Sequence, residues 1–434
     1  MQADLRPRLR AIIDGDLCFH DADSGYATHN FHAFPAKFPP QLPHAFIDAL
    51  TRPGDRVLDP MAGSGTTLVE AYLAGRAAVG VDIDPLALLL CRVKTQPRDL
   101  DALHATGERI VQAARRALRT PAALAEAIRT RYDAQSRAFF DYWFAPRAQC
   151  ELMALLRAIE AHAAPDQRDF FTLAFSAIII TKSGGVSMAR DLAHTRPHRV
   201  MDKRPHDAVN HFRRRVAQNL MSLGELDARR PRRPAPVDVL RGDARALPLA
   251  DGFVDLIVTS PPYAANAIDY MRAHKFSLAW LGQPVGELAA LRGQYVGGER
   301  LREAALTPAQ RGPLPPAVQD VVARVGAVDA RKARVLHKYY SEMGAVLCEM
   351  YRALRPGGVA VLVVGTSTMR GMDVETPRCL GEIAQAAAGF ELVGVAARAL
   401  DRNRRMMPAR VDGRGAGIER RMHQEHVIGL CRPC

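Results

Sequence analysis

Five consecutive residues, Thr259-Ser260-Pro261-Pro262-Tyr263, combine groups that could hold a flat ring carrying an amino group. They follow the apolar run 254–258, which predicts a buried strand. Pro261 and Pro262 lack N–H groups and have a fixed φ, so the backbone leaves the sheet while its carbonyls can still accept hydrogen bonds. Ser260 adds a hydroxyl acceptor, and Tyr263 adds an aromatic face for stacking. A plain strand end with a proline-rich turn would look the same, so the choice depends on the rest of the chain.

A second candidate site lies upstream, in a glycine-containing loop. Residues 56–59 predict a short strand, 60–67 a loop that opens a helix, and 77–85 a second strand ending in acids, which together form a βαβ unit. Gly63 and Gly65 would let the backbone approach a ligand at the helix N-terminus. Asp82 follows the loop by about 20 residues, where an acid can bind the two hydroxyls of a ribose.

The loop differs from phosphate-binding loops, and this difference suggests its ligand. It lacks the Lys-Ser/Thr pair of a P-loop, and Asp59 stands at its mouth. A carboxylate there repels phosphate and suits a cation. A nucleoside that carries an amino acid and a sulfonium, S-adenosylmethionine, fits this combination. A structural turn or a dinucleotide site is the alternative.

Charge points to a polyanionic partner. The chain has 434 residues, enough for two or three domains, and a net charge of +13. Residues 190–233 hold twelve Lys and Arg against five acids, and 398–421 hold eight Arg against three acids. Basic clusters on an otherwise ordinary composition favour nucleic acid as a partner. A solvated, arginine-rich surface from a GC-rich genome is the alternative.

Other features of the composition argue against a disulfide-rich, a metal-binding, a membrane-spanning or a secreted protein. Seven scattered cysteines argue against a disulfide framework, and the pair Cys431 and Cys434 has no second pair at metal-binding distance, so we expect no metal site. No apolar stretch reaches the roughly 18 residues of a membrane span, and we see no signal peptide at the N-terminus. We therefore expect a cytoplasmic protein that does not contact membranes.

The α/β pattern is interrupted by a long helical stretch. Residues 1–95 contain an N-terminal segment and the first half of the α/β domain, with the glycine loop. Residues 96–235 form a basic insertion with helices expected at 101–118, 121–131 and 147–162, and 170–181 as an apolar helix or strand. Residues 236–434 form the second half, with a polar loop excursion at 264–335 that includes a mobile stretch from 283 to 330, a helix at 334–354, and closing strands at 390–397 and 425–430.

These motifs together resemble the S-adenosylmethionine-dependent DNA amino-methyltransferases, in particular the cytosine-N4-specific type of restriction–modification systems. Residues 59–67, Asp-Pro-Met-Ala-Gly-Ser-Gly-Thr-Thr, resemble the cofactor loop of that family. Residues 34–40 resemble the segment that covers the methionine end of the cofactor. Residues 259–263 resemble the catalytic motif in its cytosine-N4 form, because adenine enzymes more often carry Asp or Asn before the two prolines. The resemblance covers 29–95 and 236–434.

The resemblance implies a fold, a reaction and a set of residues. The fold is Rossmann-like class I methyltransferase, a mostly parallel seven-stranded sheet with helices on both faces. Ser260 and the Pro261 carbonyl would accept the amino hydrogens of a flipped cytosine, Tyr263 would stack on it, and Pro262 would complete the motif. The residues expected to contact the cofactor are Phe38, Asp59, Pro60, Ala62, Gly63, Ser64, Gly65, Thr66, Thr67, Asp82, Ile83, Asp243, Ala244 and Ser260.

Double-stranded DNA is the expected partner, and a cognate restriction endonuclease would act separately. The residues expected to contact DNA are Lys182, Arg213, Arg214, Arg215, His274 and Lys275. The insertion 96–235 is the preferred target-recognition region, and 264–335 is the second candidate. Cytosine-C5 chemistry is excluded, since no cysteine lies near 259–263. Adenine N6, an RNA base, or a non-catalytic DNA-binding subunit remain alternatives, and the sequence does not give the oligomeric state.

Overall fold

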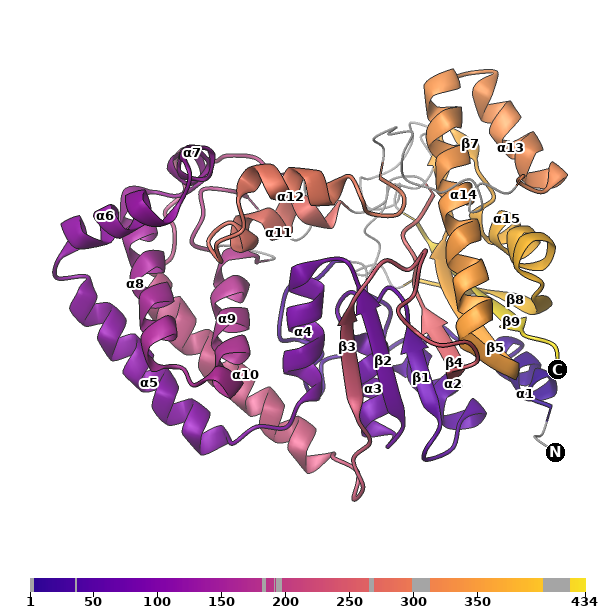
Figure 1. Ribbon diagram of the computed structural model, residues 1–434, viewed down its shortest axis with the longest axis horizontal. Helices are drawn as coiled ribbons and strands as arrows, with labels where there is room; N and C mark the ends of the chain where they lie inside the picture. Colours follow the sequence, from indigo (N-terminus) through magenta and orange to yellow (C-terminus); the bar gives the residue numbers. More distant parts are fainter. Residues whose placement is uncertain are drawn as a thin grey trace.

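A seven-stranded, mostly parallel sheet forms the centre of the protein (Figure 1). The computed structural model describes residues 4–35, 37–181, 185–190, 192, 197–264, 269–298, 313–400 and 422–434. Across the sheet the strands are β3 (Val237–Arg241), β2 (Ala77–Asp82), β1 (Arg56–Asp59), β4 (Val254–Thr259), β5 (Leu354–Gly365), β9 (Gln424–Cys431) and β8 (Glu391–Ala399).

The direction of the strands confirms the predicted fold class. From β3 to β5 all neighbours are parallel, while β9 runs antiparallel to both β5 and β8. The order changes direction at β1, which separates β2 and β3 from β4 and β5. The carboxyl ends of these parallel strands meet at one edge of the sheet, and a ligand site is expected at such a switch point.

Helices cover both faces because the central strands are apolar on both sides. Residues 359–364 of β5 are all buried, for example. Helices α1 (Arg6–Ile13), α2 (Gln41–Leu50) and α3 (Thr66–Leu73) pack on one face. Helices α14 (Ala330–Ala353) and α15 (Thr376–Ile383), which η2 (Ala384–Ala388) extends, pack on the other.

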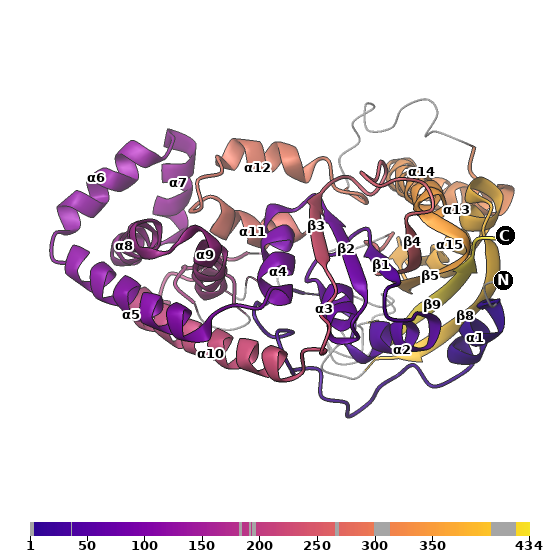
Figure 2. The same ribbon diagram turned by 60° about the horizontal axis from the view of Figure 1, so that its bottom comes forward.

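A helical layer lies beside the β3 side of the sheet, where α4 (Pro85–Thr95) ends (Figures 1 and 2). Its helices are α5 (Leu100–Ala117), α6 (Pro121–Arg131), α7 (Ala134–Trp143), α8 (Pro146–His162), α9 (Pro165–Ile179) and α10 (Ala208–Ala228). These helices share one hydrophobic core with α4 and with α11 (Tyr270–Leu278), and the rings of Phe140 and Trp280 stack 4.1 Å apart within it. The predicted stretch 170–181 is thus the helix α9, whereas the proposed division into domains stays a prediction.

The stretch 283–330 contains two helices, within its described parts 283–298 and 313–330, that the sequence does not predict. It contains α12 (Val285–Arg292) and α13 (Pro316–Gly326), and α13 packs against α14. A two-stranded hairpin, β6 (Thr368–Met369) and β7 (Met372–Asp373), follows the end of β5 and was not predicted.

Three other expectations concern disulfide bonds, metal sites and membrane-spanning helices. All seven cysteines lie in the described part of the chain and are free thiols. Within the described ranges, no three His, Cys, Asp or Glu side chains are grouped as metal ligands would be. None of the helices described above is both long and apolar enough to span a bilayer.

Candidate active site

A cavity of about 930 Å³ opens at the carboxyl ends of β1, β2, β3 and β4. This volume is in the range of small-molecule sites. The predicted residues that line it are Phe38, Asp59, Pro60, Ala62, Gly63, Ser64, Thr66, Asp82, Ile83, Asp243, Ala244, Ser260 and Pro262. Four other predicted residues, Gly65, Thr67, Pro261 and Tyr263, are not part of the described lining.

The two glycines of the loop between β1 and α3 have different surroundings. Gly63 lines the cavity, whereas Gly65 packs against α4. Gly63 lines the cavity with a φ of +49°, and a Cβ there would meet the ring of Phe34 at 3.4 Å. Gly65 has a φ of +72°, and a Cβ there would lie 3.0 Å from the Cys91 sulfur. Gly65 therefore allows α3 and α4 to pack closely, and its approach to a ligand stays a prediction.

Two carboxylates at neighbouring strand ends, Asp59 and Asp82, contribute negative charge to the cavity wall. Asp82 accepts the backbone N–H of Gly63 at 2.8 Å through one oxygen and that of Asp84 at 2.8 Å through the other. Burial, reinforced by the charge of Asp84, raises the pKa of Asp82 to about 7. Asp59 accepts the hydroxyl of Thr259 at 2.7 Å, and burial raises its pKa to about 6. A bound cation would favour the ionised form of both groups.

The end of β3 contributes a carboxylate that is already paired. Both oxygens of Asp243 accept hydrogen bonds from the guanidinium of Arg245, at 2.9 and 2.7 Å. Arg245 is buried and also donates to Glu342 of α14 at 2.8 Å. A carboxylate offers about four acceptor positions. Asp243 can therefore still accept from an amino group in the cavity, as the sequence predicts.

The motif after β4 is fixed by hydrogen bonds that leave Ser260 as an acceptor. Ser260 donates its hydroxyl hydrogen to the carbonyl of Val363 in β5 at 2.9 Å. Because a hydroxyl has one hydrogen, Oγ can only accept hydrogen bonds from a ligand in the cavity while this bond persists. The carbonyl of Pro262 accepts from Tyr339 at 2.8 Å, whereas no described residue donates to that of Pro261.

Tyr263 is predicted to stack on the target base, and it is not part of the described cavity lining. The residue is buried, and its hydroxyl donates to Glu425 of β9 at 2.9 Å. The ring packs so closely on Gly365 that a Cβ there would come within 2.6 Å of it. In the described conformation the ring therefore packs against β5 and its hydroxyl contacts β9. The stacking of Tyr263 on a base stays a prediction.

The residues predicted to contact DNA are not brought together. His274 is fully buried, and its Nδ1 lies 2.6 Å from the Asp84 carboxylate, so the prediction that it faces phosphates is wrong. The sequence did not show that this face of α11 packs against the end of β2. Lys275 is half-buried, with its ammonium 5.3 Å from the centre of the Phe139 ring.

The three arginines of α10 lie in the helical layer, outside the cavity lining. Arg213 is exposed and donates to Glu108 at 2.9 Å, and Arg214 is exposed as well. Arg215 is half-buried, and this burial lowers its pKa. Lys182 lies outside the described residues, so the structure says nothing of it.

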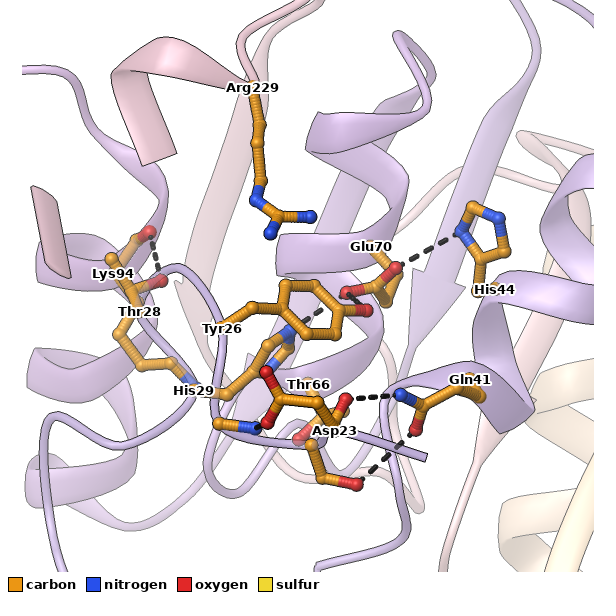
Figure 3. Close-up of polar contacts among 12 residues, drawn as sticks. Asp23, Tyr26, Thr28, His29, Gln41, His44, Thr66, Glu70, Lys94 and Arg229 are labelled. Carbon is orange, nitrogen blue, oxygen red and sulfur yellow. Dashed lines mark hydrogen bonds and ion pairs between the residues drawn. The ribbon is translucent and has the colours of Figure 1, made fainter. Parts of the chain in front are cut away.

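A buried carboxylate fastens the N-terminal segment to α3. Figure 3 shows Tyr26, His29 and His44 around Glu70, whose oxygens lie 2.8, 2.7 and 3.1 Å from the three side chains. Glu70 is 1% exposed, so these contacts are largely shielded from water. Burial lowers the pKa of His29 to about 4, which keeps its imidazole neutral. The cluster fixes the segment at both ends of the stretch that contributes to the cavity wall.

Several residues of the cavity wall escaped the sequence-based site prediction. Phe34 and Lys37 lie within the segment recognised by resemblance, and that signal could have identified them. Tyr270 stacks on Phe34 with ring centres 4.9 Å apart, and Tyr295 lines the cavity beside it. No local pattern distinguishes these two tyrosines, because they reach the cavity through the packing of α11 and α12.

Comparisons with known proteins agree with this geometry. The family model N6_N4_Mtase, described as "DNA methylase", matches residues 19–90. The type II methyltransferase M.MvaI of Kocuria varians is 24% identical over 385 residues, which cover 85% of this chain and 83% of that protein. The type II methyltransferase M.MjaII of Methanocaldococcus jannaschii is 36% identical over 94 residues, covering 21% of this chain and 18% of that protein.

Solved structures add little to the fold assignment. A SAM-dependent methyltransferase from Methanosarcina mazei has 9% identity and a TM-score of 0.32, with 89% of this chain and 97% of that chain covered. A score this low carries no weight beside the strand order itself. The family model and the relatives are thus DNA methylases and type II methyltransferases by name, and these names do not distinguish cytosine N4 from adenine N6.

Proposed function

We propose that the protein transfers a methyl group to the exocyclic N4 amino group of a cytosine flipped out of double-stranded DNA at a specific sequence. The observation that carries this proposal is the hydrogen bond from Ser260 to the Val363 carbonyl. It leaves Oγ as an acceptor at the edge of the cofactor cavity, where an amino group needs an acceptor. Serine at this position, in place of the Asp or Asn more common in adenine enzymes, favours cytosine.

The residues of the cavity fit S-adenosylmethionine, which supplies the methyl group on a sulfonium when it is bound. Asp59 and Asp82 provide negative charge that suits a cation and repels phosphate. Gly63 provides the close approach of backbone at the N-terminus of α3. We assign the ribose hydroxyls to Asp82 and the adenine amino group to Asp243, and we place the methionine end near Lys37 and Phe38.

The chain's contribution to the reaction is to position and orient the amino nitrogen. Ser260 and the Pro261 carbonyl accept its two hydrogens, which turns its lone pair out of conjugation with the ring. The bond from Thr259 to Asp59 joins the strand end that holds the base to the strand end that holds the methyl donor. Catalysis of this kind relies on orientation and fixed dipoles. A strong general base is unnecessary, since the methylated amine loses its proton readily.

The target base must leave the duplex, because its amino group is paired inside the helix. Besides Lys37, the cavity wall contains the cationic side chains Arg272, Arg292, Lys332 and Arg370, and we propose that these four contact phosphates next to the flipped base. Arg272 and Arg292 both pair with Asp269, and Arg370 pairs with Asp329. The helical layer 96–235 remains our candidate for reading the sequence of the site.

The relatives' names suggest a biological setting. Because M.MvaI is named a type II methyltransferase, we propose that this chain is the modification enzyme of a restriction–modification system. A cognate endonuclease would then act separately on the same sequence, and both would work on DNA in the prokaryotic cytoplasm.

Product analysis tests the proposal. Unmethylated DNA is incubated with the protein and methyl-labelled cofactor, digested to nucleosides and analysed by mass spectrometry. The label is expected in N4-methylcytosine. Label in N6-methyladenine would refute cytosine as the target base but would still identify the protein as a DNA amino-methyltransferase. Absence of transfer with folded protein would favour a non-catalytic DNA-binding subunit.

A further inference from the structure

We infer that the loop 294–298 forms an additional wall of the adenosyl half of the cofactor site, and that Tyr295 is the residue of this loop that contacts the adenosine. The inference rests on the cofactor of the proposed function and does not depend on which base is methylated. Residues 294–298 all line the cavity, together with Asp82, Ile83, Asp243 and Ala244. A ligand held by the two carboxylates would therefore also lie against this loop.

One side of the loop is fastened to the end of β2. Tyr295 donates its hydroxyl hydrogen to Oδ2 of Asp84 at 2.8 Å. The same oxygen lies 2.6 Å from Nδ1 of His274, and the other oxygen caps α4 by accepting the N–H of Leu86 at 2.8 Å. Asp84 is two residues from Asp82, so the Tyr295 side chain lies next to the predicted ribose position.

The other side of the loop is fastened to the end of β3 and to α14. Arg245, which forms an ion pair with Asp243, also donates to the carbonyl of Gln294 at 2.8 Å. Glu342 is 1% exposed and accepts the N–H of Gly297 at 3.0 Å. Lys338 donates to the carbonyl of Gly298 at 3.0 Å. The bonds on both sides of the loop explain how a stretch without regular secondary structure can present a fixed surface.

The loop also contacts the catalytic motif. Gly297 has a φ of +78°, and a Cβ there would lie 3.5 Å from the Tyr339 ring and 3.7 Å from Pro262. Tyr339 in turn donates to the Pro262 carbonyl. A single short loop thus connects the residues expected to hold the adenosine with the turn expected to hold the base, within the segment that follows the catalytic motif.

Binding measurements without DNA test the role of Tyr295. The dissociation constants of S-adenosylhomocysteine and of 5′-methylthioadenosine, which lacks the amino acid, are measured by titration calorimetry. Wild type is compared with Tyr295→Ala, Tyr295→Phe and the control Tyr142→Ala. Tyr142 is 52% exposed on α7 and lies outside the cavity lining. Thermal unfolding of each variant shows whether it is folded.

Loss of the ring should weaken both ligands by about tenfold, since both carry the adenosine. Tyr295→Phe keeps the ring and loses the bond to Asp84, so it should weaken both by a smaller factor, about threefold. The control should bind like wild type. Unchanged affinity in folded Tyr295→Ala, or a loss limited to S-adenosylhomocysteine, would overturn the assignment. If Tyr295→Ala does not fold, wild-type affinity of Tyr295→Phe for both ligands overturns it. Failure of wild type to bind either ligand would instead refute the cofactor assignment.

Discussion

The affinity for S-adenosylmethionine should depend on pH through Asp82 and Asp59. Burial raises the pKa of Asp82 to about 7 and that of Asp59 to about 6 in the unliganded protein. A cationic ligand and ribose hydroxyls that donate hydrogen bonds both favour the ionised carboxylates, so binding should lower the two pKa values. By linkage, affinity is then greatest above pH 7 and is lost as pH falls through both values.

The size of the effect follows from the two pKa values. A group with a pKa near 7 is about 90% ionised at pH 8 and about 10% ionised at pH 6, which weakens binding about tenfold over this interval. Asp59, with a pKa near 6, adds a factor of about two. The dissociation constant should therefore rise about 20-fold from pH 8 to pH 6, or about 1.8 kcal/mol. This value assumes that both groups are fully ionised in the complex.

Titration calorimetry measures the dissociation constant of S-adenosylmethionine from pH 6 to pH 8. Wild type is compared with the variant Asp82→Asn and with the control Asp48→Asn. The Asp48 side chain is 71% exposed on α2, away from the cavity. Asp82→Asn should bind more weakly at pH 8 and should keep only the factor of about two from Asp59. Asp48→Asn should behave as wild type. A dissociation constant that is flat over this range, or an Asp82→Asn variant with the full pH response, would refute the reasoning.

Other predictions concern the reacting amino group, the cofactor segment and the DNA. Ser260→Ala should lower kcat about 10²–10³-fold with nearly unchanged cofactor affinity, because it removes a positioned acceptor; steady-state kinetics on a cognate duplex would contradict this if kcat fell less than twofold. Tyr263→Ala should also lower turnover with cofactor affinity nearly intact, and normal turnover would exclude the stacking role. Glu70→Ala should cost about 1–3 kcal/mol of unfolding free energy in a denaturant titration, since it leaves buried neutral donors unpaired, and a cost well under about 1 kcal/mol would show that the cluster is unimportant. DNA affinity should fall steeply with salt, and Arg272→Gln should reduce the slope of log K against log salt by about 1; a flat response in the wild type would refute the role of the basic residues.

The α/β elements that carry the cofactor loop follow local rules and could be predicted. Residues 56–59 were predicted as a strand and form β1 with the same bounds. An apolar run, a glycine loop and a second strand ending in acids specify a βαβ unit almost without tertiary information. The closing strands were predicted at 390–397 and 425–430 and lie at Glu391–Ala399 and Gln424–Cys431, because their apolar character is also local.

The stretch 283–330 was predicted poorly for a physical reason. Its prolines favour a loop, but Pro284 precedes the first residue of α12 and Pro316 is the first residue of α13. At the first turn of a helix, proline loses no hydrogen bond and its φ already suits the helix. The same residue type therefore marks a loop or a helix start, and the sequence alone did not decide between them.

Within the site, the residues near the two motifs were predicted and the residues brought by packing were not. Asp59, Asp82, Asp243 and Ser260 all line one cavity, as their positions after four parallel strands predict. The bonds of His274 and Tyr295 to Asp84 join positions about 200 residues apart along the chain. Such pairs depend on how α11 and α12 pack against the end of β2, which no local spacing encodes.

The identity of the methylated nucleoside tests the central claim most directly. DNA from a methylation-free host that expresses the protein is hydrolysed, and its modified nucleosides are separated and identified by mass spectrometry. Serine at position 260, with its hydroxyl oxygen left as an acceptor, predicts N4-methylcytosine in the wild type and its loss in Ser260→Ala. N6-methyladenine in place of N4-methylcytosine would contradict the claim.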